Sequence, residues 1–318
     1  MLNIERLGVL LNPKDENHAK FNAGMIKVGD KVHMLYRWAL DNKNSSGAVL
    51  SYFKDYIAHA ELNLDGSLIH DYDEPFIAPF NEMNSEGCQD PRIIEFEGEF
   101  YIFYTAWNLD CARVGIAKTK DFKTVEHIGT IPTNEWDKDA FILPERINGK
   151  IVYIHRIEPE IQIDYFNNFE EMLDENYWKN YGNKIHNHVV IKSEFSWENK
   201  KVGGSVPPIK TDIGWLLIYH GVADDRVPFC YRAGVAVLDI NDPSKVIARL
   251  PYPILEPVED YEIKGDVDNV VFPQGVYIHE GWIYISYGGA DKVVAMARVR
   301  YNELIQELKN YYIDPNKN

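Results

Sequence analysis

Residues 271–291, VFPQGVYIHEGWIYISYGGAD, contain the pattern that decides the fold. An apolar strand leads through a glycine turn into an alternating strand that ends in aromatic and polar residues. Such an alternation around a glycine turn predicts a β-hairpin. The pattern occurs five times along the chain. The five second strands are KVHMLYR (31–37), EFYIFYT (99–105), KIVYIHR (150–156), GWLLIYH (214–220) and GWIYISYG (281–288).

The five hairpins also share one register. Their equivalent aromatic positions, separated by 68, 51, 64 and 68 residues, are Tyr36, Tyr104, His155, Tyr219 and Tyr287. The residues 14 positions before four of these are Asn22, Asp90, Ser205 and Pro273; in the third hairpin Asp139 lies 16 positions before His155. Five matching units of about 60 residues predict an all-β, five-bladed β-propeller with four-stranded blades. We expect one domain over residues 1–318, with a short C-terminal helix at 301–312.

Composition narrows the class of protein. A net charge of −16 argues against nucleic acid or an anionic membrane as a partner. There is no basic start followed by a long apolar run, and the three cysteines form no C-x-x-C pair, so we expect a cytoplasmic protein without a disulfide framework. Metal and nucleotide motifs are absent from the sequence, which predicts no metal and no cofactor.

Polar residues gather at the ends of the repeats. In a propeller these ends meet around the central channel, so we expect them to converge. They are Asn22, Arg37, Asp90, Arg92, Lys138, Asp139, His155, Arg156, Lys201, His220 and Asp291. Aspartates supply the carboxyl groups that cleavage of a sugar requires. The excess of cations is odd for a neutral sugar and water, but fits an anion beside the sugar. Phosphate is a nucleophile at neutral pH and needs only a cationic cradle and one acid, which points to phosphorolysis.

Each of these residues also has a structural interpretation. Asp90 precedes a proline and can simply make a turn, and Arg156 and His155 can pair with Glu145 or Glu158. Lys201 belongs to a basic pair that water can solvate. His220 and Tyr231 can be satisfied core residues, whereas Lys210 is expected to be exposed. Their joint placement by the repeat favours function. The acidic, aromatic insertion 157–200 is expected to pack as a loop or short helix over one face. We expect this insertion and the loop 38–47 to select the acceptor sugar.

Four segments carry a family resemblance. They are GCQDPRI (87–93), KDAFILPERINGKIVYIHR (138–156), KVGGSVPPIKTDIGWLLIYHG (201–221) and VFPQGVYIHEGWIYISYGGAD (271–291). From about Asn22 to Arg298 the chain resembles glycoside hydrolase family 130, the β-mannoside phosphorylases and related β-mannosidases, whose fold is a five-bladed propeller. The resemblance implies inverting phosphorolysis of a β-mannoside to α-mannose 1-phosphate.

The resemblance also implies roles for residues. Asp90 would be the general acid, acting through the mannose 3-hydroxyl. Asn22, Arg37 and Asp291 would hold the mannose. From the polar cluster of the repeat we add Arg92 and Asp139 to the sugar-binding residues. The phosphate-binding group would be Lys138, Arg156, Lys201, His220 and Tyr231.

The sequence departs from the family pattern at two places near these residues. Gln89 replaces a usual Glu next to the acid, and Lys138–Asp139 stands where some members have Arg-Asn. Hydrolases of the family are expected to lack basic residues of the phosphate pocket, often with Glu in their place. This chain keeps basic residues at Arg156, Lys201 and His220, which favours a phosphorylase. The alternatives are a β-mannosidase that uses water and a non-catalytic sugar-binding propeller. Acceptor sugar, β-1,2 or β-1,4 linkage and a homo-oligomeric state stay open.

Overall fold

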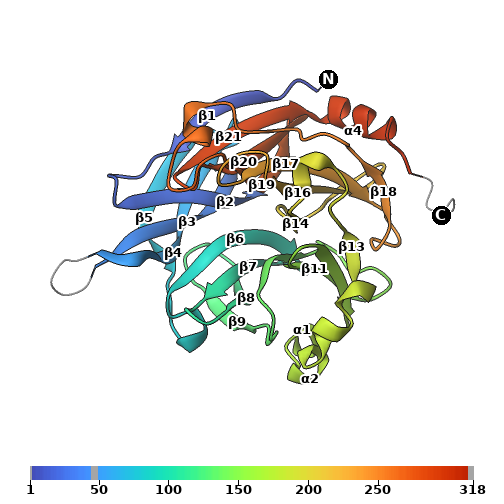
Figure 1. The fold of residues 1–318 in the computed structure, drawn as a ribbon, viewed down its shortest axis with the longest axis horizontal. Helices are drawn as coiled ribbons and strands as arrows, with labels where there is room; N and C mark the ends of the chain where they lie inside the picture. The colour runs from blue at the N-terminus through green and yellow to red at the C-terminus, as the bar shows by residue number, and fades with distance from the viewer. Residues whose placement is uncertain (1, 44–48, 314–318) are drawn as a thin grey trace.

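β-Strands dominate the structure, a computed structural model that describes residues 2–43 and 49–313 (Figure 1). Each predicted second strand is found: β3 (Lys31–Lys43), β7 (Glu99–Trp107), β11 (Ile151–Ile157), β16 (Gly214–Ala223) and β20 (Trp282–Gly289). The glycine of each predicted turn has a positive φ, between 61° and 135°, a region that L side chains rarely adopt. The all-β class is therefore confirmed.

The first two repeats form one sheet of eight strands. It comprises two antiparallel groups of four, joined by a single parallel pairing of Asp55 with Gly87. The first group is β2 (His18–Val28), β3, β4 (Val49–Asn63) and β5 (Leu68–Ile77). The second group is β6 (Gly87–Phe96), β7, β8 (Ala112–Thr119) and β9 (Glu126–Thr130).

Three further sheets follow, each from one repeat. The third group is β10 (Asp137–Ile142), β11, β12 (Ile161–Phe166) and β13 (Val189–Ile191). The fourth group is β14 (Lys201–Gly204), β15 (Ile209–Thr211), β16, β17 (Cys230–Leu238) and β18 (Val246–Arg249). The fifth group is β19 (Val271–His279), β20, β21 (Val293–Arg300) and, from the start of the chain, β1 (Glu5–Leu11).

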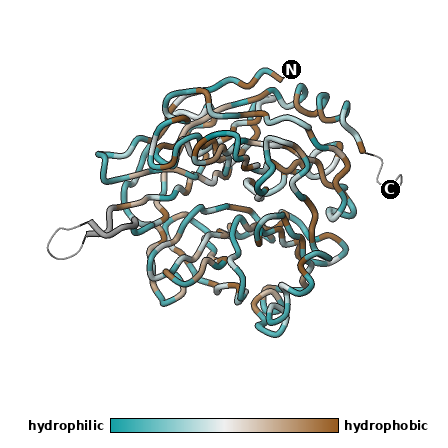
Figure 2. Tube along the Cα trace, viewed as in Figure 1, coloured by the Kyte–Doolittle hydropathy of each residue, from teal (hydrophilic) through white to brown (hydrophobic). Residues whose placement is uncertain are grey.

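Hydrophobic cores lie between neighbouring groups. Separate clusters join groups one and two, two and three, three and four, four and five, and five and one. The five repeat-equivalent residues are at most 2% exposed, because they lie on the inward faces of the central strands. Apolar stretches run along the strands inside the molecule, and hydrophilic segments lie mostly at its edge (Figure 2).

The insertion 157–200 corrects one expectation. Instead of only covering a face, it supplies the outer strands β12 and β13 of the third group, with short helices between them. These helices are α1 (Phe169–Met172), α2 (Glu175–Trp178), η2 (Tyr181–Asn183) and η3 (Ile185–Asn187). The strand pattern was missed because these two outer strands are short and separated by 22 residues.

The remaining helices are short. They are η1 (Glu82–Asn84), η4 (Ser196–Glu198), α3 (Asp260–Ile263) and α4 (Tyr301–Lys309), and α4 matches the predicted C-terminal helix. Of the loop 38–47, residues 38–43 belong to β3 and 44–47 lie outside the described residues. Within the described part of the chain, no helix combines the length and apolar character needed to cross a membrane.

Candidate active site

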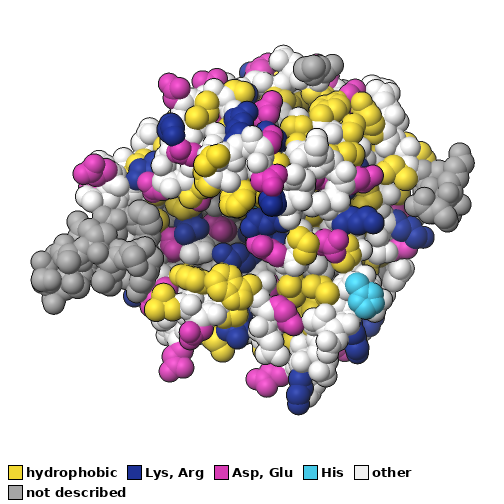
Figure 3. All heavy atoms as spheres, in the orientation of Figure 1, with side chains coloured by type: hydrophobic (Ala, Val, Ile, Leu, Met, Phe, Trp, Pro, Cys, Tyr) yellow, Lys and Arg dark blue, Asp and Glu magenta, His cyan; other side chains and the backbone are white. Residues whose placement is uncertain are grey.

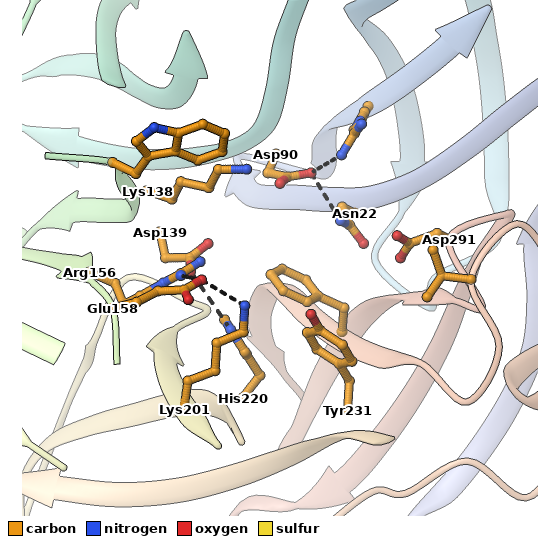
Figure 4. Close-up of a pocket in the computed structure, with 14 residues that line it drawn as sticks. Asn22, Asp90, Lys138, Asp139, Arg156, Glu158, Lys201, His220, Tyr231 and Asp291 are labelled. Atoms are coloured by element: carbon orange, nitrogen blue, oxygen red, sulfur yellow. Dashed lines mark hydrogen bonds and ion pairs between the residues drawn. The ribbon is translucent and has the colours of Figure 1, made fainter. Parts of the chain in front are cut away.

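One cavity, with a volume of about 360 Å³, brings most of the predicted site residues together (Figure 4). Ten of the eleven line it, which are Asn22, Arg37, Asp90, Lys138, Asp139, Arg156, Lys201, His220, Tyr231 and Asp291. The other described lining residues are Trp136, Glu158, Val267 and Phe272. In the space-filling view, Lys and Arg side chains gather near the centre of the visible face (Figure 3). The size fits a small ligand.

Backbone geometry explains why three of these side chains converge. Asn22, Asp90 and Asp139 have φ values of 47°, 53° and 55°, and each lies where the pairing of its inner strand shifts register. Such a β-bulge turns a side chain out of the normal alternation and is common beside active sites. Asn and Asp tolerate the left-handed backbone better than most residues. The repeated offset in the sequence is therefore a repeated bulge.

Asp90 lies at the centre of a chain of polar contacts. Its Oδ1 accepts a hydrogen bond of 2.9 Å from Asn22 Nδ2 and lies 3.5 Å from Nη1 of Arg37. Arg37 is oriented from behind by Asp55, with Nε–Oδ1 and Nη2–Oδ2 distances of 2.7 and 3.1 Å. Gln89 Nε2 donates to Asp55 Oδ2 over 2.7 Å. A Glu at position 89 would place a second carboxylate against Asp55, so the amide removes a like-charge contact.

Asp291 lies on the opposite side of Asn22 from Asp90 in Figure 4. Burial raises the pKa of Asp291 to about 7, although Arg37 acts in the opposite direction. Near neutral pH this carboxyl group therefore both donates and accepts hydrogen bonds. A sugar hydroxyl can use either.

Asp139 organises the other side of the cavity. Its Oδ1 lies 2.9 Å from Nη2 of Arg92, and its Oδ2 accepts a 2.8 Å hydrogen bond from Nε of Arg156. Burial disfavours the Asp139 charge, but Arg156 and Arg92 hold its pKa well below the usual range. This carboxylate is engaged in orienting arginines.

Arg92 corrects the sugar-binding prediction. It is 1% exposed and is not among the described residues that line the cavity. Besides Asp139, its guanidinium donates to the backbone oxygens of Ser205, Asp90 and Gly204 over 3.0 Å each. Because all these contacts are to protein, Arg92 braces the wall of the cavity instead of facing a ligand.

His220 enters the site as a neutral group. Burial, with Arg156 and Arg92 adding to it, lowers its pKa to about 3, although Asp139 raises it. His220 was grouped with the basic residues Arg156 and Lys201 from the sequence, but its burial removes it from the cations of the site. Its Nδ1 lies 3.0 Å from Ser205 Oγ. Opposite it, a Cβ on Gly203 would lie 2.4 Å from the imidazole, so only glycine leaves room for this ring.

Three cations and one unanticipated carboxylate complete the cavity. Lys138, whose pKa is lowered by burial, lies 6.0 Å above the Trp107 ring and forms no ion pair with any described carboxylate. Lys201 Nζ lies 2.7 Å from Glu158 Oε1, and Arg156 pairs with the same oxygen. Sequence reasoning named Glu158 only as a partner of Arg156, because nothing in its position marks it as a cavity residue.

His155 does not belong to the cavity. It is fully buried in the third group, with Nδ1 2.9 Å from Asp137 Oδ1 and Nε2 3.0 Å from Asp164 Oδ2. Side chains alternate along a strand, so His155 and its neighbour Arg156 point to opposite faces of β11. The prediction that both converge on one site is wrong for His155.

A second polar cluster contains residue types that can bind a metal ion. His33, His59 and Glu61 each place a ligand atom within 4.8 Å of the others. However, Lys31 Nζ already lies 2.9 Å from Glu61 Oε2, and the two imidazoles contact each other at 3.0 Å. The Lys31 ammonium beside this carboxylate opposes the binding of a divalent cation.

Known proteins resemble this chain over nearly its whole length. The glycoside hydrolase family 130 model, described as beta-1,4-mannooligosaccharide phosphorylase, matches residues 4–310. A 1,2-beta-oligomannan phosphorylase of Thermoanaerobacter sp. is 35% identical, over 96% of this chain and 99% of its own. A beta-1,2-mannobiose phosphorylase of the same strain is 39% identical, over 89% and 90%. The structure of a beta-1,2-mannobiose phosphorylase from Listeria innocua in complex with beta-1,2-mannobiose has a TM-score of 0.81 at 26% identity, over 97% and 100%.

Proposed function

This chain belongs to glycoside hydrolase family 130, and from that premise we propose that it cleaves β-mannosides with inorganic phosphate. The products are α-mannose 1-phosphate and the shortened sugar, formed with inversion. Relatives 35% and 39% identical bear names that specify β-1,2 linkages, so we propose a β-1,2-linked manno-oligosaccharide as the substrate.

The observation that carries the proposal is the ammonium of Lys138, which has no ion-pair partner among the described carboxylates. A partly buried cation without a carboxylate partner is costly unless a ligand supplies the negative charge. Arg156 and Lys201 line the same cavity, so a phosphate dianion there would meet three cations. A neutral sugar and water would compensate none of them.

The reaction assigns one role to each side of the cavity. Phosphate, held by Lys138, Arg156 and Lys201, attacks the anomeric carbon, and the bond from that carbon to the glycosidic oxygen breaks. Asp90 supplies the proton that the leaving oxygen takes up, relayed through the mannose 3-hydroxyl. Asn22 and Arg37 hold the Asp90 carboxyl group in place. His220 and Tyr231 contribute hydrogen bonds, since burial keeps the first neutral and raises the pKa of the second to about 12.

We also propose that the five strand groups close into a five-bladed propeller within a single domain, residues 1–318. Two observations support this: the hydrophobic clusters link each group to the next and the fifth to the first, and β1 completes the fifth group from the start of the chain. The cytoplasm is the proposed compartment, because Cys88, Cys111 and Cys230 are all unpaired and buried. No cofactor is part of the proposal.

Hydrolysis by water is the second candidate function, and the presence of the Glu158 carboxylate in the cavity favours it. An inverting hydrolase needs one carboxyl group as acid and another as base. Asp90 and Glu158 both line the cavity and could fill those roles. Release of sugar from β-1,2-mannobiose, measured in buffers with and without phosphate, separates the two. We expect cleavage only with phosphate; equal rates in both buffers would establish the hydrolase instead.

A further inference from the structure

The Glu158 carboxylate spans two cations of the proposed phosphate cradle. Its Oε1 lies 2.7 Å from Lys201 Nζ and also pairs with Nη1 of Arg156 (Figure 4). Both cations line the cavity, and so does Glu158 itself. One carboxylate oxygen therefore occupies the position between two cations that a phosphate oxygen would take.

The two cations are more deeply buried than the anion. The side chains of Arg156 and Lys201 are 8% and 23% exposed, whereas that of Glu158 is 54% exposed. Asp139 fixes Arg156 independently, through Nε at 2.8 Å and Nη2 at 2.7 Å. Arg156 therefore keeps its orientation without Glu158, and its Nη1 stays directed at the place where the carboxylate lies.

Only the side chain of Glu158 needs to move for the cradle to open. The backbone around it is tied down: Ile157 exchanges hydrogen bonds of 2.7 and 3.1 Å with the Gln162 side chain, and Pro159 O accepts 3.0 Å from Val202 N. A half-exposed Glu side chain has several staggered rotamers that lead into solvent. Its departure leaves the strands unchanged and frees one donor on each cation.

We propose that Glu158 is an internal anion that occupies the phosphate position in the free protein and is displaced into solvent when inorganic phosphate binds. This inference rests on the proposed phosphorolysis. A carboxylate that competes for the same cations lowers the apparent affinity for phosphate, because only the fraction of molecules with an open cradle can bind. Glu158 thus sets the phosphate concentration at which the site fills.

Equilibrium binding of inorganic phosphate tests this without any sugar. Isothermal titration calorimetry would compare the unchanged protein with Glu158→Gln, which keeps the shape of the side chain but removes its charge. We expect the dissociation constant for phosphate to fall about three- to tenfold. This range corresponds to the loss of one exposed ion pair, together with the repulsion between the Glu158 carboxylate and phosphate. Glu160→Gln removes the same charge two residues away, outside the cavity lining, and should change the constant by less than about twofold.

Three results would overturn the inference. Weaker phosphate binding by Glu158→Gln would mean that the carboxylate positions Lys201. An unchanged dissociation constant would mean that the carboxylate does not compete with phosphate. The absence of phosphate binding by either protein would mean the same. Glu158→Ser guards against an effect peculiar to the amide and should also tighten binding. If the protein without substitutions cleaves mannobiose equally well in the absence of phosphate, the proposed function is wrong. If it carries out phosphorolysis but Glu158→Gln has the same dissociation constant for phosphate, only the role of Glu158 is wrong.

Discussion

At the residue scale, the site depends on left-handed backbone at four polar positions, Asp291 and the three bulge residues. Asn22, Asp90 and Asp139 combine a positive φ with side chains that turn into the cavity. Asp90 is the carboxyl group in contact with both an amide and a guanidinium that line the same cavity. Asp139, by contrast, is engaged with arginines. These contacts hold the Asp90 carboxyl group in the cavity, where the proposed reaction needs an acid.

Replacement of Asp90 tests that assignment. Asp90→Asn keeps the hydrogen-bonding shape but has no acidic proton, so kcat should fall about 10²- to 10⁴-fold. Calorimetry should still detect mannobiose binding. Asp110→Asn, at an exposed turn of the second group, serves as the control. Near-normal turnover by Asp90→Asn would refute its role as the acid.

The neighbouring lysines 200 and 201 offer a matched test of the cradle. Lys201→Ala removes a donor that lines the cavity, so the KM for phosphate should rise about 10- to 100-fold, as for a lost hydrogen bond between charged groups. Lys200 pairs with Asp224 at the surface, and Lys200→Ala should leave this KM unchanged. Equal effects from both substitutions would show that the cradle is misplaced.

The sequence alone predicted most of the residues that line the cavity. The residues that it missed or misjudged have physical explanations. The repeat offset found Asn22, Asp90 and Asp139, because the pairing of their inner strands shifts register at the equivalent point of the repeat. Asp55 was missed because it acts through Arg37, from the middle of a long strand that no motif marks. Glu158 was underrated because its contact with Lys201 joins the turn after β11 to the start of β14, 43 residues further along the chain. His220 was grouped with the basic residues because a sequence does not show that its imidazole is buried.

At the element scale, the third strand group contains a buried electrostatic cluster. His155 on β11 lies between Asp137 on β10 and Asp164 on β12, and Tyr181 from the connection between β12 and β13 donates to Asp164 over 2.6 Å. The cluster ties four consecutive segments of the chain together. It explains why a histidine replaces the tyrosine of the other repeats: an imidazolium can bridge two carboxylates.

This cluster predicts how stability depends on pH. Burial opposes the charge of His155, but Asp137 and Asp164 raise its pKa to about 9, against about 6.5 in an unfolded chain. A raised pKa stabilises the fold fully below about pH 6.5, and this stabilisation is lost as the pH rises through about 9. The free energy of unfolding should therefore decrease over that interval, by about 1–3 kcal/mol from this group.

Urea unfolding from pH 6 to 10 provides the measurement, with His155→Gln as the comparison. The variant should be less stable at pH 6 and should lose most of this slope. Parallel pH profiles for the two proteins would show that His155 is neutral in the folded state.

At the scale of the whole molecule, the two ends of the repeat series meet. β1 pairs with β21, and Arg6 on β1 reaches the fully buried carboxylate of Glu262 at 2.8 Å. Glu262 also accepts a 2.8 Å hydrogen bond from Tyr287 on β20. The sequence predicted five repeats, but β1 precedes the first hairpin and has a glycine inside it, so its place in the fifth group could not be inferred from its pattern.

Removal of the Arg6 side chain measures what this junction contributes. Arg6→Ala leaves the buried Glu262 carboxylate without its cation, so the free energy of unfolding should fall by about 2–4 kcal/mol. The exposed pair of Lys309 with Asp212 is the control, and Lys309→Ala should cost about 0.5 kcal/mol or less. Equal small losses in both variants would show that Arg6 contributes no more than a surface residue.

The central claim is that phosphate, not water, attacks the mannoside. The most direct test is ³¹P NMR of the protein with β-1,2-mannobiose and inorganic phosphate. The account predicts that the phosphate signal declines while that of α-mannose 1-phosphate rises, in step with the release of mannose. Release of mannose with the inorganic phosphate signal undiminished would contradict it.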